Sequence, residues 1–258
     1  MFDVVVIGAG IMGAAVSREL SKYELKVLLL DKENDVSCGT TKANSAIVHA
    51  GYDAKEGSLM AKYNVLGNAM YEDLCKEVDA PFRRVGSYVL AFSEKEKEHL
   101  EMLYQRGVNN GVPEMEIIDA AEIQKREPHV SKEAVAALYA GTAGITGPWE
   151  LTIKLVENAM ENGVKLKLNS EVINIKKENN IFKIELKSGE VIKTKALINA
   201  AGVYADFINN MLSSKKFKIT PRIGEYYLLD KVQGYLTDSV IFQCPTEMGK
   251  GILVSKTV

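Results

Sequence analysis

Apolar and polar residues alternate in blocks along the first thirty positions. Residues 2–7 read F-D-V-V-V-I, a β-branched run that predicts a strand buried on both faces. Residues 14–23 have the composition of a helix, and the apolar run 26–30 predicts a second strand that ends at Asp31. A glycine-rich turn, G-A-G-I-M-G, joins the first strand to the helix. This order predicts a parallel α/β unit at the amino end of the chain.

The middle of the chain predicts a mixture of helices and strands. Ser58 is expected to cap a helix that runs to about residue 78, with an apolar stripe at helical spacing. We expect this stripe to pack in the core; it consists of Leu59, Tyr63, Leu66, Met70, Leu74 and Val78. The pattern also predicts strands over 87–92, 114–119 and 135–140, a charged helix over 94–109 and a short helix near Glu122.

The last hundred residues return to the pattern of a parallel sheet with additions. A buried strand over 196–199 leads into Ala200, Ala201 and Gly202, where the lack of bulk allows a ligand to approach the backbone. Close packing of a helix on a strand, without a ligand, is the alternative explanation of these small residues. The remaining predicted elements are a helix over 149–162, strands over 164–168, 171–177, 181–187 and 251–256, and a helix from near Val203.

The glycine-rich turn has the chemistry of a dinucleotide site. Gly8 permits a tight turn, Gly10 leaves room for a pyrophosphate beside the backbone, and Gly13 lets the helix pack on the strand. The helix start at Ile11 and Met12 offers free N–H groups and the positive end of the helix dipole. The alternative is a glycine-rich turn that binds nothing.

The carboxylate of Asp31, at the end of the second strand, can accept hydrogen bonds from the two hydroxyls of an adenosine ribose. A carboxylate there argues against a ribose 2′-phosphate, because two anions would repel each other. Lys32, beside it, weakens that argument a little and is a further candidate for contact with the cofactor.

The glycine motif does not separate FAD from a nicotinamide dinucleotide, so the segment after Asp31 becomes informative. It is rich in hydroxyl and amide groups that can bind phosphate and ribitol oxygens, although a polar surface loop would have the same composition. The candidate cofactor residues in it are Thr40, Thr41, Asn44, Ser45 and Ala46.

Four stretches together resemble one superfamily. The chain is similar to the flavin-dependent oxidoreductases of the D-amino-acid-oxidase superfamily, and most like the anaerobic-type glycerol-3-phosphate dehydrogenases and the L-2-hydroxyglutarate dehydrogenase/oxidase group. The four stretches are V-V-V-I-G-A-G-I-M-G-A-A at 4–15, T-T-K-A-N-S-A-I-V-H-A-G at 40–51, G-P-W-E-L-T at 147–152 and A-L-I-N-A-A-G-V-Y-A-D at 196–206.

The resemblance implies a fold and a cofactor. The fold class is α/β: a Rossmann-like FAD/NAD(P)-binding domain joined to a discontinuous α+β substrate domain. The FAD-binding domain would comprise residues 1–80 and 145–212, and the partial substrate domain 81–144 and 213–258. The backbone of Val172 would lie beside the adenine of FAD. Members of the superfamily continue beyond the position matching residue 258, so the resemblance also implies that this chain is truncated at its carboxyl end.

The catalytic candidates follow from the same resemblance. Oxidation of a carbinol by FAD requires transfer of a hydride to flavin N5 and of the hydroxyl proton to a base. His49, at the end of the 40–51 stretch, is the expected base, with a purely local hydrogen bond as the alternative; a covalent flavin–histidine link is less favoured. A small anionic substrate requires a cation, and the candidates are Arg83, Arg84 and Arg222. Arg222 is preferred because it begins a segment, with Tyr226, that resembles a strand lining the substrate side of the relatives.

Composition sets limits on the partners. The 258 residues include 32 Lys+Arg and 34 Asp+Glu, a net charge of −2 that gives no reason to expect nucleic acid. Three cysteines without a C-x-x-C pair favour a reducing, cytoplasmic setting, with peripheral attachment to the inner face of a membrane or a second subunit as further options. No apolar run is long enough to span a membrane, and no metal site is expected.

Three functional hypotheses remain at this stage. The first is an FAD-dependent dehydrogenase or oxidase acting on glycerol 3-phosphate or a 2-hydroxy acid. The second is a truncated FAD-binding module that is inactive or depends on a partner. The third, supported by the first forty residues alone, is a nicotinamide-dependent dehydrogenase. The electron acceptor, whether a quinone, oxygen or a partner protein, is left open.

Overall fold

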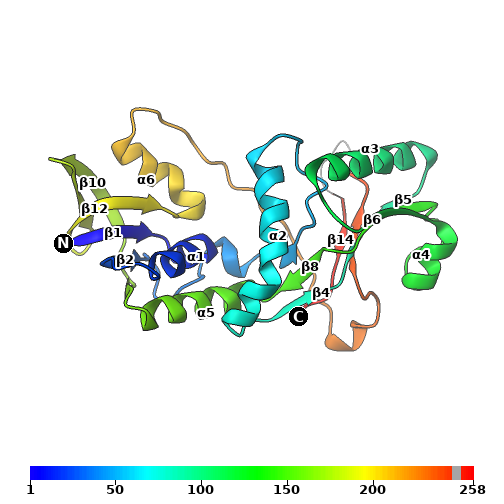
Figure 1. The fold of residues 1–258 in the computed structure, drawn as a ribbon, viewed down its shortest axis with the longest axis horizontal. Coiled ribbons are helices and arrows are strands. Elements are labelled where there is room, and N and C mark those ends of the chain that lie inside the picture. The colour runs from blue at the N-terminus through cyan, green and yellow to red at the C-terminus, as the bar shows by residue number, and fades with distance from the viewer. Residues whose placement is uncertain (246–250) are drawn as a thin grey trace. The chain divides into compact units, whose positions relative to one another are not determined.

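The computed structural model describes residues 1–245 and 251–258, which form two compact units (Figure 1). Unit 1 contains Met1–Asn44 and Pro148–Glu225, and unit 2 contains Ser45–Gly147 and Tyr226–Val258. The chain therefore begins in unit 1, passes to unit 2, returns to unit 1 and ends in unit 2. The α/β fold class with a discontinuous arrangement, expected from the sequence, is confirmed.

Unit 1 is built on a six-stranded sheet with the order β10-β11-β12-β1-β2-β9. The neighbours β12, β1, β2 and β9 run parallel, whereas β10, β11 and β12 form an antiparallel meander that contains the strands predicted over 171–177 and 181–187. The strands are β1 (Phe2–Ile7), β2 (Val27–Leu30), β9 (Lys165–Lys167), β10 (Val172–Glu178), β11 (Ile181–Leu186) and β12 (Val191–Asn199).

Helices complete unit 1. Helices α1 (Ile11–Leu20) and α5 (Pro148–Glu161) contact each other extensively, and α6 (Ala205–Leu212) contacts β10 and β12 (Figure 1). Short 3-10 helices cover Thr40–Lys42 and Gly202–Tyr204. The strand residues are apolar because β1 and β2 are buried on both sides, and Val5, Leu29 and Leu30 have no exposed surface.

Unit 2 contains two further sheets, of order β14-β13-β5-β7-β6 and β3-β8-β4. Their strands are β3 (Ile47–Val48), β4 (Phe82–Arg84), β5 (Ser87–Ala91), β6 (Met115–Asp119), β7 (Ala136–Ala140), β8 (Gly144–Thr146), β13 (Val240–Gln243) and β14 (Leu253–Val254). The helices are α2 (Leu59–Glu77), α3 (Glu94–Asn110) and α4 (Ala120–Arg126), with a 3-10 turn at Lys231–Gln233. Ser58 caps α2, as predicted, and Ser93 caps α3.

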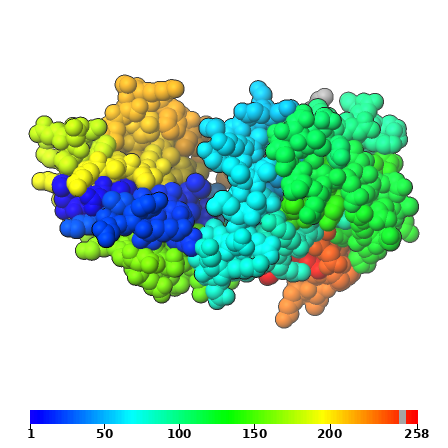
Figure 2. Space-filling model, in the orientation of Figure 1, coloured from blue at the N-terminus to red at the C-terminus, as the bar shows by residue number. Residues whose placement is uncertain are grey.

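The apolar stripe of α2 is not core, so that expectation is wrong. Leu59, Tyr63, Leu66 and Met70 expose between 50% and 71% of their surface, and only the end of the stripe, at Val78, is buried. The buried residues of the helix are instead Ala61, Asn68 and Cys75. Helix α2 lies at the surface on the face shown in Figure 2. Helical spacing identifies an apolar face but does not specify what covers it.

Other bounds also differ from the sequence expectation. Because α2 contacts α3 and β4, residues 45–80 belong to unit 2, and the division between the units falls after Asn44 rather than at residue 80. The strand expected over 251–256 is limited to Leu253–Val254. Residues 219–230 contain no strand, including the segment from Arg222 to Tyr226. Residues 246–250, part of the expected substrate domain, lie outside the described residues.

One buried carboxylate holds a loop of unit 2. Glu127 is only 3% exposed and accepts hydrogen bonds from the Thr237 hydroxyl and the Asp238 N–H, both at 3.2 Å. We expect Glu127→Ala to lower the free energy of unfolding by about 1–3 kcal/mol, because the Asp238 N–H would lose its acceptor. Glu127→Gln keeps an acceptor and should cost less, and Glu133→Ala, at an exposed position, is the control. Urea unfolding measures all three; equal stability of Glu127→Ala and the unmodified protein would contradict the assignment.

Candidate cofactor-binding site

Three loops of unit 1 leave the sheet side by side. Ile7 is paired in register with Leu30 of β2 and with Asn199 of β12, so the carboxyl ends of these parallel strands lie at one edge. The glycine-rich turn, Asp31 and the Ala200–Gly202 segment therefore emerge together. This edge of a parallel sheet is where open α/β folds bind their ligands.

The glycine-rich turn depends on two glycines for its shape. Gly8 has φ 106°, and a Cβ there would lie 2.4 Å from the carbonyl oxygen of Ala200. A Cβ on Gly13 would lie 1.8 Å from the carbonyl oxygen of Gly8, so helix α1 can sit this close to the turn only without a side chain. Close packing therefore explains two of the three glycines, Gly8 against the Ala200 segment and Gly13 against the turn itself.

The amino end of α1 is suited to an anion. Gly10 is the N-cap residue and provides no side-chain cap, and the first turn contains no acidic residue. The N–H groups of Met12 and Gly13 belong to that first turn, where an α-helix offers no internal acceptor. Phosphate oxygens would supply acceptors and would be favoured by the helix dipole.

Asp31 is fixed by backbone hydrogen bonds. Its Oδ2 accepts from the Ala9 N–H at 2.6 Å, and its Oδ1 accepts from the Glu33 N–H at 2.9 Å. The Ala9 carbonyl accepts in turn from the Ser37 N–H at 3.0 Å. A carboxylate can accept about four hydrogen bonds, so acceptor capacity remains for ribose hydroxyls.

The polar segment after Asp31 folds against the glycine-rich turn. The Thr41 Oγ1 accepts from the Ile11 N–H at 3.1 Å, and it lies 3.0 Å from the position of a Cβ on Gly10. Asn44 donates its side-chain amide to the carbonyls of Thr40 and Thr41 at 3.1 Å and 2.7 Å. Of the predicted residues in this segment, Thr40, Thr41 and Asn44 thus lie with the turn.

Ser45 and Ala46 belong to unit 2. The Ala46 carbonyl accepts from the Thr146 N–H at 3.0 Å, and Ala46 has φ 59°, a left-handed conformation that is uncommon for alanine. Their predicted contact with the cofactor stays a prediction.

Val172 and the segment before it lie beside Asp31. The Asn169 N–H donates to the Glu33 carbonyl at 2.8 Å, and the Ser170 N–H donates to the Asp31 carbonyl at 2.7 Å. The structure therefore brings Val172, the expected adenine contact, close to Asp31, the expected ribose contact, although their residue numbers differ by 141.

The segment after β12 is held by short hydrogen bonds. The Ala200 N–H donates to the Ile7 carbonyl at 2.8 Å, and the Asn199 side chain both accepts from the Ala201 N–H at 3.2 Å and donates to the Ala205 carbonyl at 2.8 Å. Gly202 has φ 54° and nothing within 4 Å of an added Cβ. Two residues at this edge were not singled out from the sequence, Ser37 and Tyr204; an aromatic residue just after A-A-G was the available signal for Tyr204.

Unit 2 contains the histidine candidate. His49 follows β3, its carbonyl accepts from the Asn68 amide at 3.0 Å, and its ring stacks on Phe242 with centroids 5.7 Å apart and planes inclined by 24°. Since Phe242 is on β13 and Asn68 is on α2, two elements fix the position of His49.

The arginine candidates differ in their surroundings. Arg84 donates to the carbonyls of Asn68 and Thr142 and to the Asn68 side-chain oxygen, and it lies 3.5 Å from a Glu72 oxygen. These contacts within the protein occupy its guanidinium. Arg222 and Tyr226 are exposed, on a segment without regular structure. Their predicted roles at the substrate stay predictions.

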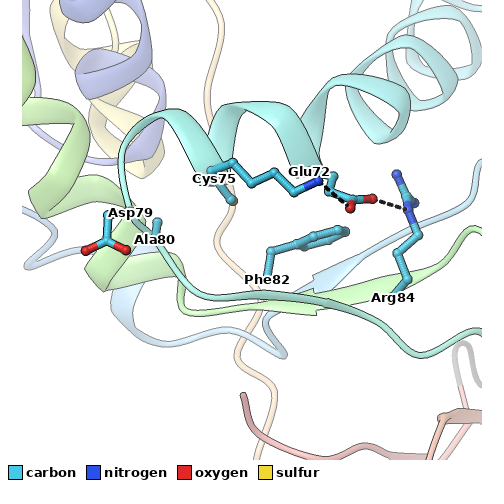
Figure 3. Close-up of a pocket in the computed structure, with 7 residues that line it drawn as sticks. Glu72, Cys75, Asp79, Ala80, Phe82 and Arg84 are labelled. Atoms are coloured by element: carbon cyan, nitrogen blue, oxygen red, sulfur yellow. Dashed lines mark hydrogen bonds and ion pairs between the residues drawn. The ribbon is translucent and has the colours of Figure 1, made fainter.

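A cavity of about 560 Å³ in unit 2 lies elsewhere, at the carboxyl end of α2 and beside β4 (Figure 3). Three of its charged groups pair with one another: the Glu72 carboxylate pairs with Lys76 at 2.9 Å and with Arg84, whereas Asp79 lines the cavity as a further carboxylate. Of the predicted site residues the cavity contains Arg84, whose guanidinium is already engaged by Glu72 and Asn68. The edge of the unit 1 sheet is therefore the candidate site.

Neither a metal cluster nor a membrane helix accompanies this site. Within residues 1–245 and 251–258, no group of three or more His, Cys, Asp or Glu side chains is placed to hold a metal ion. Over the same described part of the chain, no helix has both the length and the apolar character needed to cross a bilayer.

The unit 1 edge fits a dinucleotide by its own geometry. It combines an uncapped helix start, a turn whose glycines exclude side chains, a fixed carboxylate and a polar 3-10 segment. The N–H groups of Met12 and Gly13 are available to phosphate oxygens and the Asp31 carboxylate to ribose hydroxyls, whereas the Ile11 N–H already donates to Thr41. The contacts predicted for Gly8, Gly10 and Ile11 stay predictions.

Among curated proteins, the chain is similar to glycerol 3-phosphate dehydrogenases and oxidases and to L-2-hydroxyglutarate dehydrogenases. The chain is 53% identical to a glycerol 3-phosphate dehydrogenase of Caloramator mitchellensis, over 100% of this chain and 54% of that protein. It is 33% identical to a glycerol 3-phosphate oxidase of Mycoplasma genitalium, over 98% of this chain and 68% of the relative. The chain thus spans about half to two thirds of the length of these relatives.

A solved structure of a glycerophosphate oxidase is also similar to this chain. The dithionite-reduced L-alpha-glycerophosphate oxidase of Mycoplasma pneumoniae with FAD bound matches with a TM-score of 0.86 and 31% identity, over 98% of this chain and 68% of that chain. The glycine oxidase of Geobacillus kaustophilus matches with a TM-score of 0.79 at 18% identity, which indicates a shared fold alone.

A family-wide sequence comparison covers almost the whole chain. Residues 3–257 match the family described as FAD dependent oxidoreductase. The match includes the glycine-rich turn, Asp31, and the segments that both units contribute. The resemblance inferred from four short stretches is confirmed, and the cofactor of the family is FAD. The chain belongs to the DAO family of FAD-dependent oxidoreductases.

Proposed function

We propose that the protein oxidises the secondary hydroxyl group of glycerol 3-phosphate, with FAD as the cofactor. The dinucleotide cradle of unit 1 consists of the glycine-rich turn 8–13, the start of α1 and Asp31. The observation that carries the proposal is the presence of this cradle in a chain 53% identical to a glycerol 3-phosphate dehydrogenase. The uncapped α1 start and the Asp31 carboxylate account for binding of the cofactor. FAD, when bound, supplies the hydride acceptor.

His49 is proposed as the base that takes the hydroxyl proton. Removal of that proton makes departure of the carbon-bound hydrogen as hydride easier, and imidazole is the side chain best matched to this task near neutral pH. The stack on Phe242 restricts rotation of the imidazole ring. Restricted rotation favours one direction of approach for the hydroxyl group.

The anionic end of the substrate requires a cation, and Arg222 is proposed for it. A guanidinium can donate two parallel hydrogen bonds to one phosphate or carboxylate. Tyr226 would add a phenol donor from the same segment. The electron acceptor is proposed to be a quinone, oxygen or a partner protein. The free state of Cys38, Cys75 and Cys244 is compatible with work in the reducing cytoplasm or at the inner face of a membrane.

A 2-hydroxy acid is the second candidate substrate. The chain is 32% identical to an L-2-hydroxyglutarate dehydrogenase of Indibacter alkaliphilus, over 95% of this chain and 61% of that protein. The same hydride and proton leave a 2-hydroxy acid, and a carboxylate would take the place of the phosphate.

Anaerobic bleaching of the flavin tests the proposal. The purified protein, reconstituted with FAD, is mixed without oxygen with glycerol 3-phosphate, L-2-hydroxyglutarate, glycerol or glycine. We expect the flavin absorbance to fall with glycerol 3-phosphate and not with glycerol. Bleaching by L-2-hydroxyglutarate alone would favour the second candidate. A protein that retains no flavin, or a retained flavin that no hydroxy compound bleaches, would overturn the proposal.

Asp31 provides a direct test of the cofactor site. We expect Asp31→Ala to raise the Kd for FAD by about 10- to 100-fold, because hydrogen bonds to a charged acceptor contribute about 1.5–3 kcal/mol each. Asp35→Ala is the matched control, since the Asp35 carboxylate accepts only from the adjacent Val36 N–H at 2.7 Å in the described structure. Quenching of FAD fluorescence gives both constants. Equal Kd values for the two variants would contradict the role of Asp31.

A further inference from the structure

A lysine and a tyrosine meet across the candidate cofactor site. The Lys32 ammonium lies 3.8 Å from the centroid of the Tyr204 ring, and Lys32 also pairs with Glu33 at 3.4 Å. Lys32 follows β2 directly, whereas Tyr204 ends the 3-10 turn after β12. The two residues are 172 apart in numbering and lie on opposite sides of β1.

The position of this contact is set by the strand register. Because Ile7 is in register with both Leu30 and Asn199, the residues that follow β2 and β12 flank the Gly8 turn. The Lys32–Tyr204 contact therefore spans the end of β1, one residue after the carboxylate assigned to the ribose. Partial burial acts to lower the pKa of Lys32, but the Tyr204 hydroxyl and the Glu33 carboxylate outweigh it and raise the pKa, so the cation persists at neutral pH.

The segment expected beside the adenine is on the same side of the site. Ser170 is hydrogen-bonded to the Asp31 carbonyl, and Val172 begins β10 two residues later. Glu171, between them, is close enough to Lys32 for the lysine to assist the ion pair with Lys187 in lowering the pKa of its carboxyl. Lys32 thus connects the adenine segment to Tyr204.

The Tyr204 ring is accessible to a ligand. It is 53% exposed, so about half of its surface is accessible. One face of an aromatic ring can carry a cation while its remaining surface receives a heteroaromatic base. A base stacked on an aromatic side chain gains binding energy without any specific hydrogen bond.

We propose that Tyr204 is a stacking platform for the adenine of FAD, held in position by Lys32. The inference rests on the proposed function, since it requires that unit 1 binds FAD. Within that function it assigns the adenine end of the cofactor to a side chain outside the glycine motif. The flavin end is not involved, so the effect belongs to retention of the cofactor rather than to the oxidation step.

The test compares two ligands that share the ADP part, adenosine with its two phosphates, and differ in the flavin. The apoprotein is titrated with FAD, and ADP is then used to displace FAD. We expect Tyr204→Leu to raise the Kd for FAD and the inhibition constant of ADP by the same factor, about tenfold, as for loss of one base–aromatic stack. Tyr204→Phe keeps the ring and should remain within about twofold of the unmodified protein for both ligands. Lys32→Met should give an intermediate increase, because the ring stays but loses its anchor.

Tyr23→Leu is the matched control. Tyr23 is also in unit 1 and is 68% exposed, but it follows the carboxyl end of α1, away from the sheet edge. Thermal unfolding of each apoprotein shows whether a variant is folded. An unchanged FAD Kd in Tyr204→Leu, or a loss of FAD affinity without a loss of ADP affinity, would overturn the platform while leaving the proposed function standing. Absence of FAD binding by the unmodified protein would instead overturn the proposed function together with this inference.

Discussion

Replacement of His49 by glutamine is expected to slow the anaerobic bleaching of bound FAD by glycerol 3-phosphate by about 10²- to 10⁴-fold, the usual contribution of a positioned general base. Glutamine keeps an amide of similar reach but accepts no proton at neutral pH. Because the ribose and pyrophosphate contacts are assigned to unit 1 residues, the affinity for FAD should hardly change. Stopped-flow absorbance of the flavin isolates this half-reaction from the unknown electron acceptor.

The control for His49 is another histidine of unit 2. His129 contacts Tyr235 edge-on, with centroids 5.2 Å apart, and His129→Gln should leave the rate within about twofold. The acid limb of the pH profile provides a second readout: it should be present in the unmodified protein and absent from His49→Gln. A variant that bleaches at the normal rate would exclude His49 as the base.

Replacement of Gly13 by alanine is expected to destabilise the protein by about 3 kcal/mol or more and to abolish retention of FAD. The added Cβ would lie 1.8 Å from the Gly8 carbonyl oxygen, so α1 and the turn would have to separate. In an ordinary helix the same change would stabilise by about 1 kcal/mol, and the predicted sign is therefore opposite to helix propensity.

Gly67→Ala is the matched control for Gly13. Gly67 lies within α2, and nothing is within 4 Å of the position of its added Cβ. This variant should gain about 0.5–1 kcal/mol in free energy of unfolding. Urea unfolding with and without FAD measures both substitutions. Stabilisation of Gly13→Ala would show that the turn and the helix are not in close contact.

The local elements were largely predictable because their signals are local. The β-branched run 2–7, the glycine spacing at 8, 10 and 13, and the carboxylate at Asp31 each depend on a few neighbouring residues. The caps at Ser58 and Ser93 are of the same kind, since each side chain accepts from an N–H three residues later. In each of these cases the partner is within one or two helical turns or at the end of the same strand.

The errors arose where burial depends on distant segments. The stripe Leu59, Tyr63, Leu66 and Met70 has the spacing of a core face, yet all four residues are exposed. Glutamate is usually exposed, yet Glu127 is buried because the loop around Thr237 covers it. Helical periodicity and residue type indicate which residues favour burial. Whether those residues are buried depends on how other elements pack against them.

Residues 2–31 are sufficient to specify the cradle, because they contain a strand, a turn that requires glycine, a helix start without an N-cap side chain and an acid at the end of the next strand. The tertiary structure decided which remote residues join it, by placing Ser170 against Asp31 and Tyr204 against Lys32. The physical reason is that a turn is specified by the backbone freedom of its own residues, whereas contacts between strand ends depend on the order and register of the whole sheet.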